Sequence, residues 1–317
     1  LSEYKVQNRG GVGSKGAKTK DEDFIEQIFV ATNHNYILFF SENGKCFWLR
    51  VYEIPEGSRT SKGRPIQNLI NIEQNDRILA FINVLNLSDE EYINNHYIVL
   101  ATKKGIIKKT TLEAYSRPRT NGIIAVNVRE GDTLLEAKLT NGNNHIMMAV
   151  KSGKAIRFPE SLVRPMGRGA SGVKAVTLRD EQDEVVGMIC VEGESQDVLV
   201  VSSKGYGKRS SVEDYRITNR GGKGVKTISI TEKTGELVAM KQVVDDEDLI
   251  IINKSGVMIR MSVADTRVMG RATQGVKLIN LKNGDSIAAV AKVMHEEDEA
   301  IEIDETIESM DDQDDGT

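Results

Sequence analysis

The chain is poor in the residues that would cross-link a protein or embed it in a membrane. Of its 317 residues, 2 are cysteines, 5 are prolines and 4 are histidines, and aromatic residues make up only 5%. No stretch approaches the roughly 18 consecutive apolar residues of a transmembrane helix. The first residues, 1–4, are neither basic nor apolar, so we expect no signal peptide, and the lack of an initial methionine indicates a fragment. These absences favour a cytoplasmic protein with reduced thiols at Cys46 and Cys190.

The sequence also lacks a self-contained catalytic or metal site. The histidines share no metal-like spacing with one another or with the cysteines, and no serine stands in an elbow-type glycine setting. The run 11–16 spells G-x-G-x-x-G, but neither the apolar strand nor the apolar helix that a dinucleotide site requires flanks it. Ala17 stands where a phosphate-binding P-loop needs lysine. We therefore expect no catalytic residue, metal or cofactor in this chain.

The formal net charge of −5 conceals an uneven distribution. Residues 296–317 contain 12 Asp and Glu and no Lys or Arg. Residues 1–295 therefore hold all 42 Lys and Arg against 35 Asp and Glu, a net charge of +7. A basic body predicts an anionic partner. The acidic tail has too few large apolar side chains to offset the entropy of ordering, so we expect it to be disordered, with either a regulatory or a solubilising role.

A unit of about 50 residues recurs along the basic body. Its turn glycines lie 61, 48, 52 and 51 residues apart, at Gly44, Gly105, Gly153, Gly205 and Gly256. A second glycine recurs at intervals of 59, 50, 52 and 51, at Gly63, Gly122, Gly172, Gly224 and Gly275. Short β-branched runs between glycine turns are typical of strands. About four strands in a unit of this length are typical of a propeller blade.

The repeat predicts an all-β, propeller-like ring of six blades over residues 1–295, followed by the tail, 296–317. Five of the repeats are complete. The segment 1–33 carries a basic loop and the strands after it but lacks the preceding hairpin. We therefore expect the first blade to be incomplete.

Basic residues recur at two places in each unit. One set follows the turn glycine: Lys45, Arg50, Lys108, Lys109, Lys154, Arg157, Lys208, Arg209 and Arg260. The other set lies in the second glycine's loop: Arg9, Lys15, Lys18, Lys20, Arg59, Lys62, Arg64, Arg117, Arg119, Arg164, Arg168, Lys174, Arg216, Arg220, Lys223, Lys226, Arg267, Arg271 and Lys277. Equivalent loops of a ring share one rim, so this pattern predicts a positive belt that binds the phosphates of duplex DNA without reading its sequence. The scarcity of aromatics argues against single-strand binding by base stacking.

Several stretches resemble the C-terminal domain of the bacterial DNA gyrase A subunit: 1–4 with 7–13, then 63–66, 205–209 and 270–276. The resemblance covers essentially the whole chain. It implies a six-bladed β-pinwheel that exchanges strands between adjacent blades and wraps DNA around its outer edge in a right-handed sense. The wrap would present a positive crossover for ATP-dependent negative supercoiling by a type IIA topoisomerase. The implied partners are the N-terminal part of the same gyrase A polypeptide and the gyrase B subunit in an A2B2 assembly, and these would hold the catalytic tyrosine, the ATP and the Mg²⁺.

The family's signature heptapeptide maps onto Gln7, Asn8, Arg9, Gly10, Gly11, Val12 and Gly13. Asn8 and Val12 are neutral where the family has cations, although Lys15, Lys18 and Lys20 lie nearby. A second box-like run has the cation that Val12 lacks, and consists of Arg220, Gly221, Gly222, Lys223 and Gly224. The partly neutral first box leaves a topoisomerase IV-type pinwheel, which binds DNA without strong wrapping, as the alternative. A protein-binding propeller is a further alternative, but the chain lacks the Gly-His and Trp-Asp signatures of WD repeats.

Overall fold

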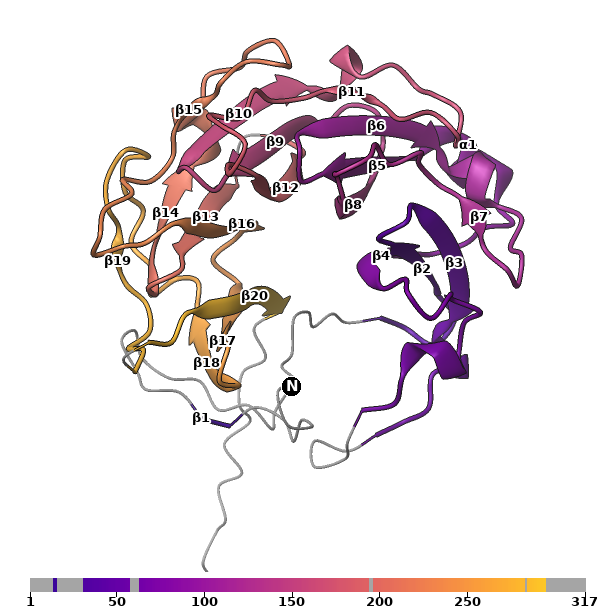
Figure 1. Cartoon of the computed structure of the whole chain (residues 1–317), viewed down its shortest axis with the longest axis horizontal. Coiled ribbons are helices and arrows are strands. Elements are labelled where there is room, and N and C mark those ends of the chain that lie inside the picture. Colours follow the sequence, from indigo (N-terminus) through magenta and orange to yellow (C-terminus); the bar gives the residue numbers. More distant parts are fainter. Residues whose placement is uncertain (1–13, 16–30, 58–62, 194–195, 283, 295–317) are drawn as a thin grey trace, which may run out of the picture.

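Five sheets build the part of the chain that the structure describes. This computed structural model describes residues 14–15, 31–57, 63–193, 196–282 and 284–294. They form five four-stranded antiparallel sheets, the blades, which lie side by side in an arc around a central channel (Figure 1). The innermost strands of neighbouring blades contact one another in chain order.

The blades are named A to E in chain order, and their strands are given from the channel outward. Blade A contains β4 (Ile78–Val84), β2 (Tyr36–Ser41), β3 (Lys45–Arg50) and β7 (Ile123–Ile124). Blade B contains β8 (Leu134–Thr140), β5 (Tyr97–Thr102), β6 (Ile106–Thr111) and β11 (Val173–Lys174). Blade C contains β12 (Val185–Val191), β9 (His145–Val150), β10 (Lys154–Pro159) and β15 (Val225–Lys226).

The last two blades follow the same plan. Blade D contains β16 (Leu237–Val243), β13 (Asp197–Ser202), β14 (Tyr206–Ser211) and β19 (Val276–Lys277). Blade E contains β20 (Ile287–Met294), β17 (Glu247–Asn253), β18 (Val257–Ser262) and β1 (Ser14–Lys15). The connections include helix α1 (Glu90–Asn95) and the 3₁₀ turns η1 (Val51–Glu53), η2 (Ile66–Asn68), η3 (Leu112–Tyr115), η4 (Glu160–Leu162) and η5 (Val212–Asp214).

The outer strand of each blade comes from the following repeat. Thus β7 pairs with β3, β11 with β6, β15 with β10 and β19 with β14, all antiparallel. The exchange also joins the two ends of the chain, because β1 pairs with β18 through Ser14↔Met258 and Lys15↔Val257. The segment before the first complete repeat therefore completes the last blade.

The prediction of six blades is wrong for the described residues, which form five. The physical reason is the strand exchange. A blade needs the hairpin of its own repeat, and the segment 1–33 has none in this sequence. Its two described strand residues instead supply the outer strand of blade E. The all-β, propeller-like class is correct.

Each blade completes its core with its neighbour. One hydrophobic cluster joins Leu38 and Phe40 of blade A to Ile98 and Leu100 of blade B, and all four are essentially inaccessible. The middle strands are buried along almost their whole length. This burial on both faces explains why they read in the sequence as continuous apolar runs rather than as alternating ones.

Most of the repeated glycines stand at close backbone contacts. Gly224 has φ +71°, and a Cβ built on it would lie 2.5 Å from the carbonyl oxygen of Ala155 in β10. Gly44 has φ +78°, and its Cβ would lie 2.3 Å from the carbonyl oxygen of Val126, just after β7. Both positions need the left-handed backbone that glycine adopts without strain. The two glycine landmarks of the sequence thus mark the two places where successive repeats interlock.

Candidate nucleic-acid interface

Four described loops carry the predicted cations on the outer perimeter of the arc, where they lead into β7, β11, β15 and β19 (Figure 1). The loops are 116–122, 163–172, 215–224 and 266–275. Their exposed basic residues, together with those of the strands they enter, are the rim cations: Arg117, Arg119, Arg164, Lys174, Arg216, Arg220, Lys223, Lys226, Arg267 and Lys277. Arg64, before η2, is also exposed. Strand exchange therefore places the same cationic loop at the edge of four successive blades.

The lysines that end three of the outer strands point outward for a simple reason. Each of these strands reads Val-Lys, and successive side chains of a strand point to opposite faces. The valine is half-buried against the blade, and Lys174, Lys226 or Lys277 is exposed. In β7 the same position is occupied by Ile124, which is also exposed.

An arginine of each longer loop joins its blade to the preceding one. The Nη1 atoms of Arg168, Arg220 and Arg271 donate to the carbonyl oxygens that end β7, β11 and β15, at 3.1, 2.9 and 2.7 Å. The Nε atoms of Arg220 and Arg271 also donate to carbonyl oxygens of Leu162 and Asp214, at 3.1 and 3.0 Å. These predicted phosphate ligands therefore also fasten the exchanged strands, while their charge stays at the perimeter.

The glycines of the second box-like run have partners within the protein. The Gly221 N–H donates to the Ala175 carbonyl oxygen at 2.6 Å, and the Thr177 N–H donates to the Gly222 carbonyl oxygen at 2.8 Å. Thr177 Oγ1 donates to the Gly221 carbonyl oxygen at 2.7 Å. The sequence suggests that such glycines bring a free backbone close to a phosphate. These hydrogen bonds place Gly221 and Gly222 at the junction with blade B, and their contact with DNA stays a prediction.

The cations that follow the turn glycines are mostly buried, which corrects the prediction that they form part of the belt. Arg50 and Lys154 are exposed and Lys45 is half-buried. The other six are between 0 and 7% exposed, namely Lys108, Lys109, Arg157, Lys208, Arg209 and Arg260. They lie on the third strands of the blades, which the exchanged outer strands and their loops cover. These side chains therefore cannot reach DNA phosphates.

Several of these buried side chains donate to the 3₁₀ turn, or its equivalent, in the next blade. Arg157 Nη1 donates to the carbonyl oxygens of Val212 and Tyr215 at 3.0 and 3.4 Å. Lys109 Nζ donates to the Glu160 carbonyl oxygen at 3.3 Å. Trp48, at the same place in blade A, donates from Nε1 to the Tyr115 carbonyl oxygen at 3.0 Å. This position thus fixes the start of each rim loop.

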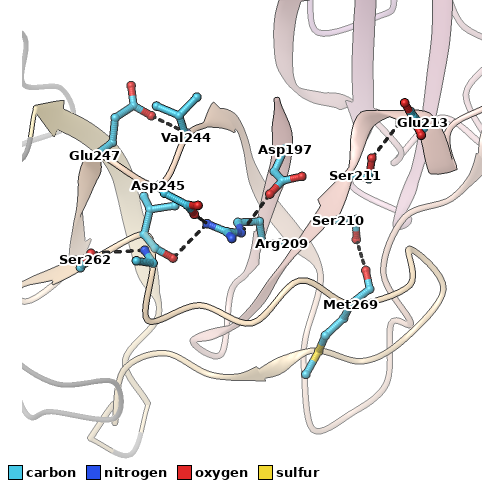
Figure 2. A network of polar contacts seen from close by, with 12 residues as sticks. Asp197, Arg209, Ser210, Ser211, Glu213, Val244, Asp245, Glu247, Ser262 and Met269 are labelled. Carbon is cyan, nitrogen blue, oxygen red and sulfur yellow. Dashed lines mark hydrogen bonds and ion pairs between the residues drawn. The ribbon is translucent and has the colours of Figure 1, made fainter. Parts of the chain in front are cut away.

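Arg209 makes the corresponding contact in blade D and adds ion pairs. Its Nη1 lies 2.6 Å from Asp245 Oδ1 and 3.4 Å from the Val263 carbonyl oxygen, and its Nε lies 3.1 Å from Asp197 Oδ2 (Figure 2). Ser210, beside it, donates from Oγ to the Met269 carbonyl oxygen at 2.7 Å (Figure 2). Arg209 and Ser210 thus hold the chain at Val263 and at Met269, on either side of the first residues of the rim loop 266–275.

Two further lysines lie under the rim loops. Lys208 Nζ donates to the Gly270 carbonyl oxygen at 2.7 Å, and Lys108 Nζ donates to the carbonyl oxygens of Ala125 and Arg168. Burial lowers the pKa of each lysine to about 8. The nearby guanidinium of Arg168 or Arg271 contributes to this lowering of the pKa, which Asp214 partly opposes at Lys208. The rim cations therefore rest on a second, internal layer of basic groups.

All of the first box, residues 7–13, lies outside the described residues. The structure also leaves undescribed the acidic tail, 296–317. The predicted DNA-binding residues outside the described ranges are Gln7, Arg9, Gly10, Gly11, Gly13, Lys18, Lys20, Arg59 and Lys62. Lys15 is placed in β1. The structure therefore brings together the predicted residues of four loops and leaves the contribution of the first box as a prediction.

The central channel is a feature that sequence reasoning missed. A cavity of about 690 Å³ lies between the inner strands, lined in part by Lys138, Lys241 and Lys292. Lys138 lies 3.2 Å from Glu136 and Lys292 lies 2.7 Å from Glu247. Burial lowers the pKa of Lys241. Polar and apolar residues alternate along the inner strands, and this alternation in the sequence is the signal that places polar side chains on the channel face.

The described residues contain no group of three or more His, Cys, Asp and Glu that could hold a metal ion. Within the same part of the chain, no helix is long and apolar enough to span a membrane. Cys46 and Cys190 are free thiols, and burial raises the pKa of both, that of Cys190 to about 12.

Comparison with known proteins agrees with this geometry. The family model described as "DNA gyrase C-terminal domain, beta-propeller" matches residues 1–32, 35–84, 96–141, 144–192, 196–243 and 247–294. The chain is 46% identical over 299 residues to the DNA gyrase A subunit of Staphylococcus epidermidis, covering 94% of this chain and 33% of that protein. It is 44% identical over 319 residues to the DNA gyrase A subunit of Staphylococcus aureus, covering 100% of this chain and 35% of that protein. The chain thus spans about a third of the length of these relatives.

Solved structures show the same architecture. A structure titled "Structure of DNA gyrase A C-terminal domain" superposes with a TM-score of 0.80 at 26% identity, covering 92% of this chain and 94% of that one. The C-terminal domain of DNA topoisomerase IV superposes with a TM-score of 0.74 at 22% identity, covering 89% and 86%, which is a likeness of fold. The family model covers most of the chain, and the relatives share more than two fifths of their aligned residues with it. The chain therefore belongs to the family of DNA gyrase C-terminal domains with a β-propeller fold.

Proposed function

We propose that this chain binds duplex DNA along its outer perimeter and wraps it without reading its sequence. The wrap would present a positive crossover for ATP-dependent negative supercoiling. The observation that carries the proposal is the recurrence of exposed cations on the rim loops of successive blades. Contacts to phosphates supply affinity that does not depend on base sequence. A curved array of such contacts can offset the elastic cost of bending the duplex.

The proposed phosphate ligands are the rim cations and Arg64, with Arg168 and Arg271 at the junctions between blades. Gln7, Arg9, Lys15, Lys18, Arg59 and Lys62 extend the same surface in the proposal. Five of the buried cations support the rim loops from within: Lys108, Lys109, Arg157, Lys208 and Arg209.

The relatives are about three times as long as this chain, which supports a proposal about the rest of the assembly. We propose that residues 1–295 act as the DNA-wrapping domain of a gyrase A polypeptide, together with the N-terminal part of that polypeptide and the gyrase B subunit in the bacterial cytoplasm. In this proposal the ATP and Mg²⁺ of the holoenzyme bind outside this chain. Residues 296–317 follow this domain in the sequence as an acidic tail.

The salt dependence of binding tests the electrostatic part of the proposal. If the chain contacts roughly six to ten phosphates, log K falls with log[salt] at a slope of about −5 to −9. The rim variant replaces by Gln three lysines that end outer strands: Lys174, Lys226 and Lys277. It should reduce the slope by about 3. The charge-matched control replaces three exposed lysines of the hairpin turns, Lys104, Lys204 and Lys254, and should leave the slope unchanged. A wild-type slope near zero would refute DNA binding by the rim.

Linking number tests the wrapping itself. A nicked circular plasmid is bound by the chain and sealed, and its linking number is then measured. A positive shift that scales with the protein supports right-handed wrapping. Salt-sensitive binding with no shift would instead favour a topoisomerase IV-type role, in which the cations hold DNA without wrapping it.

A further inference from the structure

An exposed arginine followed by an exposed apolar residue recurs on the rim. The pairs are Arg164–Pro165, Arg216–Ile217 and Arg267–Val268, at the same distance before the loop glycines of three successive blades. Ile217 and Val268 are 53% and 47% exposed, and Pro165 is exposed as well. The shorter loop of the preceding blade contains an exposed Arg117–Pro118 pair. Single exposed apolar residues are common, but their repetition at one structural position calls for an explanation.

The backbone beside each apolar residue is held firmly. Pro165, Ile217 and Val268 form parallel bridges with Lys109, Arg157 and Arg209. The residue after each apolar residue donates its backbone N–H to the carbonyl oxygen of the same bridge partner. The distances to the carbonyl oxygens of Lys109, Arg157 and Arg209 are 2.7, 2.9 and 2.7 Å. Each apolar side chain is therefore presented to solvent from a fixed backbone.

The middle pair shows how completely the loop is fixed. The Tyr215 carbonyl oxygen, just before Arg216–Ile217, accepts from Arg157 Nη1. Just after the pair, both the N–H and the Oγ1 of Thr218 donate to the Arg157 carbonyl oxygen. One buried arginine thus holds the chain on both sides of an exposed isoleucine. Such preorganisation reduces the entropic cost of binding at that point.

The placement of the pairs limits what they contact. The apolar residues lie on separate blades, each beside a cation, so they form no continuous patch of the kind a protein partner covers. The pairs present a cation and a small apolar side chain to the ligand at regular intervals. A matching ligand must therefore have a surface on which charged ridges alternate with apolar grooves. Duplex DNA does so, since its sugars and base edges line the minor groove between phosphate strands. Bent DNA commonly accepts proline, isoleucine or similar side chains there.

We propose that Pro165, Ile217 and Val268 enter the minor groove of duplex DNA as it crosses successive blades, and that they promote its bending. The preceding arginine of each pair contacts the flanking phosphates. This inference rests on the proposed function. It adds that wrapping depends on apolar contacts as well as on charge.

The test uses the 317-residue chain and separates affinity from bending. The variant is I217Q/V268Q, and the matched control is L85Q, because Leu85 is an apolar residue 67% exposed next to an inner strand, away from the rim. We expect I217Q/V268Q to reduce the linking-number shift per bound protein by roughly two-fold or more while keeping the wild-type salt slope. L85Q should match the wild type in both measurements, and all three proteins should melt within about 3 °C of one another.

A minor-groove ligand supplies the second readout. Netropsin, added to A·T-rich plasmid, should reduce the linking-number shift produced by the wild type. It should scarcely change the smaller linking-number shift that I217Q/V268Q still produces. An equal shift for the variant and L85Q, or equal netropsin sensitivity, would overturn the inference while leaving the proposed function intact. A wild type that fails to bind or wrap DNA would overturn both.

Discussion

Replacing Arg157 by methionine tests whether the buried cations act on stability rather than on DNA. The substitution keeps the apolar stem but removes the donors to the carbonyl oxygens of Val212 and Tyr215. Each buried carbonyl left without a donor costs about 1–3 kcal/mol. Since water can satisfy part of this loss at the rim, we take the lower half of the range and expect a total of about 3 kcal/mol. At about 2–4 °C per kcal/mol, the melting temperature should fall by roughly 6–12 °C.

Arg164 provides the matched control, because it lies in the same repeat as Arg157 but is exposed. R164M should change stability by no more than about 0.5 kcal/mol and should reduce the salt slope of DNA binding by about 1. R157M should show the reverse pattern, with reduced stability and an unchanged slope. Calorimetry and binding titrations at several salt concentrations measure the two quantities. If R157M reduced the slope as R164M does, the assignment of the buried cations to an internal role would be refuted.

Three further predictions concern the glycines, the buried lysines and the tail. G224A should destabilise the fold by about 2 kcal/mol or more in urea titrations, since Gly224 has φ +71° and a Cβ there would meet the Ala155 carbonyl oxygen. The control G270A should be nearly neutral, because there is open space around Gly270. Lys108 and Lys208 have folded pKa values of about 8 against an ordinary 10.5. The unfolded chain therefore binds more protons between these values, so stability should rise with pH across this window, and K108M/K208M should flatten that rise relative to the wild type. Ending the chain after Met294 should strengthen DNA binding several-fold, because 12 acidic groups no longer compete with the phosphates; equal affinity of the two chains would leave the tail a solubilising role.

The repeat could be predicted because its landmarks are backbone requirements. Gly44 and Gly224 each stand where a side chain would collide with the neighbouring repeat, so their spacing reports the blade period directly. The exposed lysines of the rim could also be predicted, since Val-Lys after a loop glycine places the lysine on the outer face. Composition and period therefore lead to an all-β ring with a cationic edge.

The number of blades and the fate of the hairpin cations could not be predicted, for one physical reason. Both depend on which strand lies beside which, and the partner of an outer strand belongs to another repeat. Lys108 and Arg157 follow turn glycines just as an exposed hairpin cation would. Only the covering strand and loop from the next repeat bury them.

The pairing of β1 with β18 has a consequence for how the chain folds during synthesis. Each blade remains one strand short until the following repeat, about 50 residues later, leaves the ribosome; at about 5–20 residues per second this is a delay of several seconds. Blade E is the exception, because its missing strand, Ser14–Lys15, is made before the blade's other strands and must wait for them. The last blade made is therefore completed by the earliest-made strand of the five blades. Its closure over so long a loop should be the slow, entropically costly step of folding.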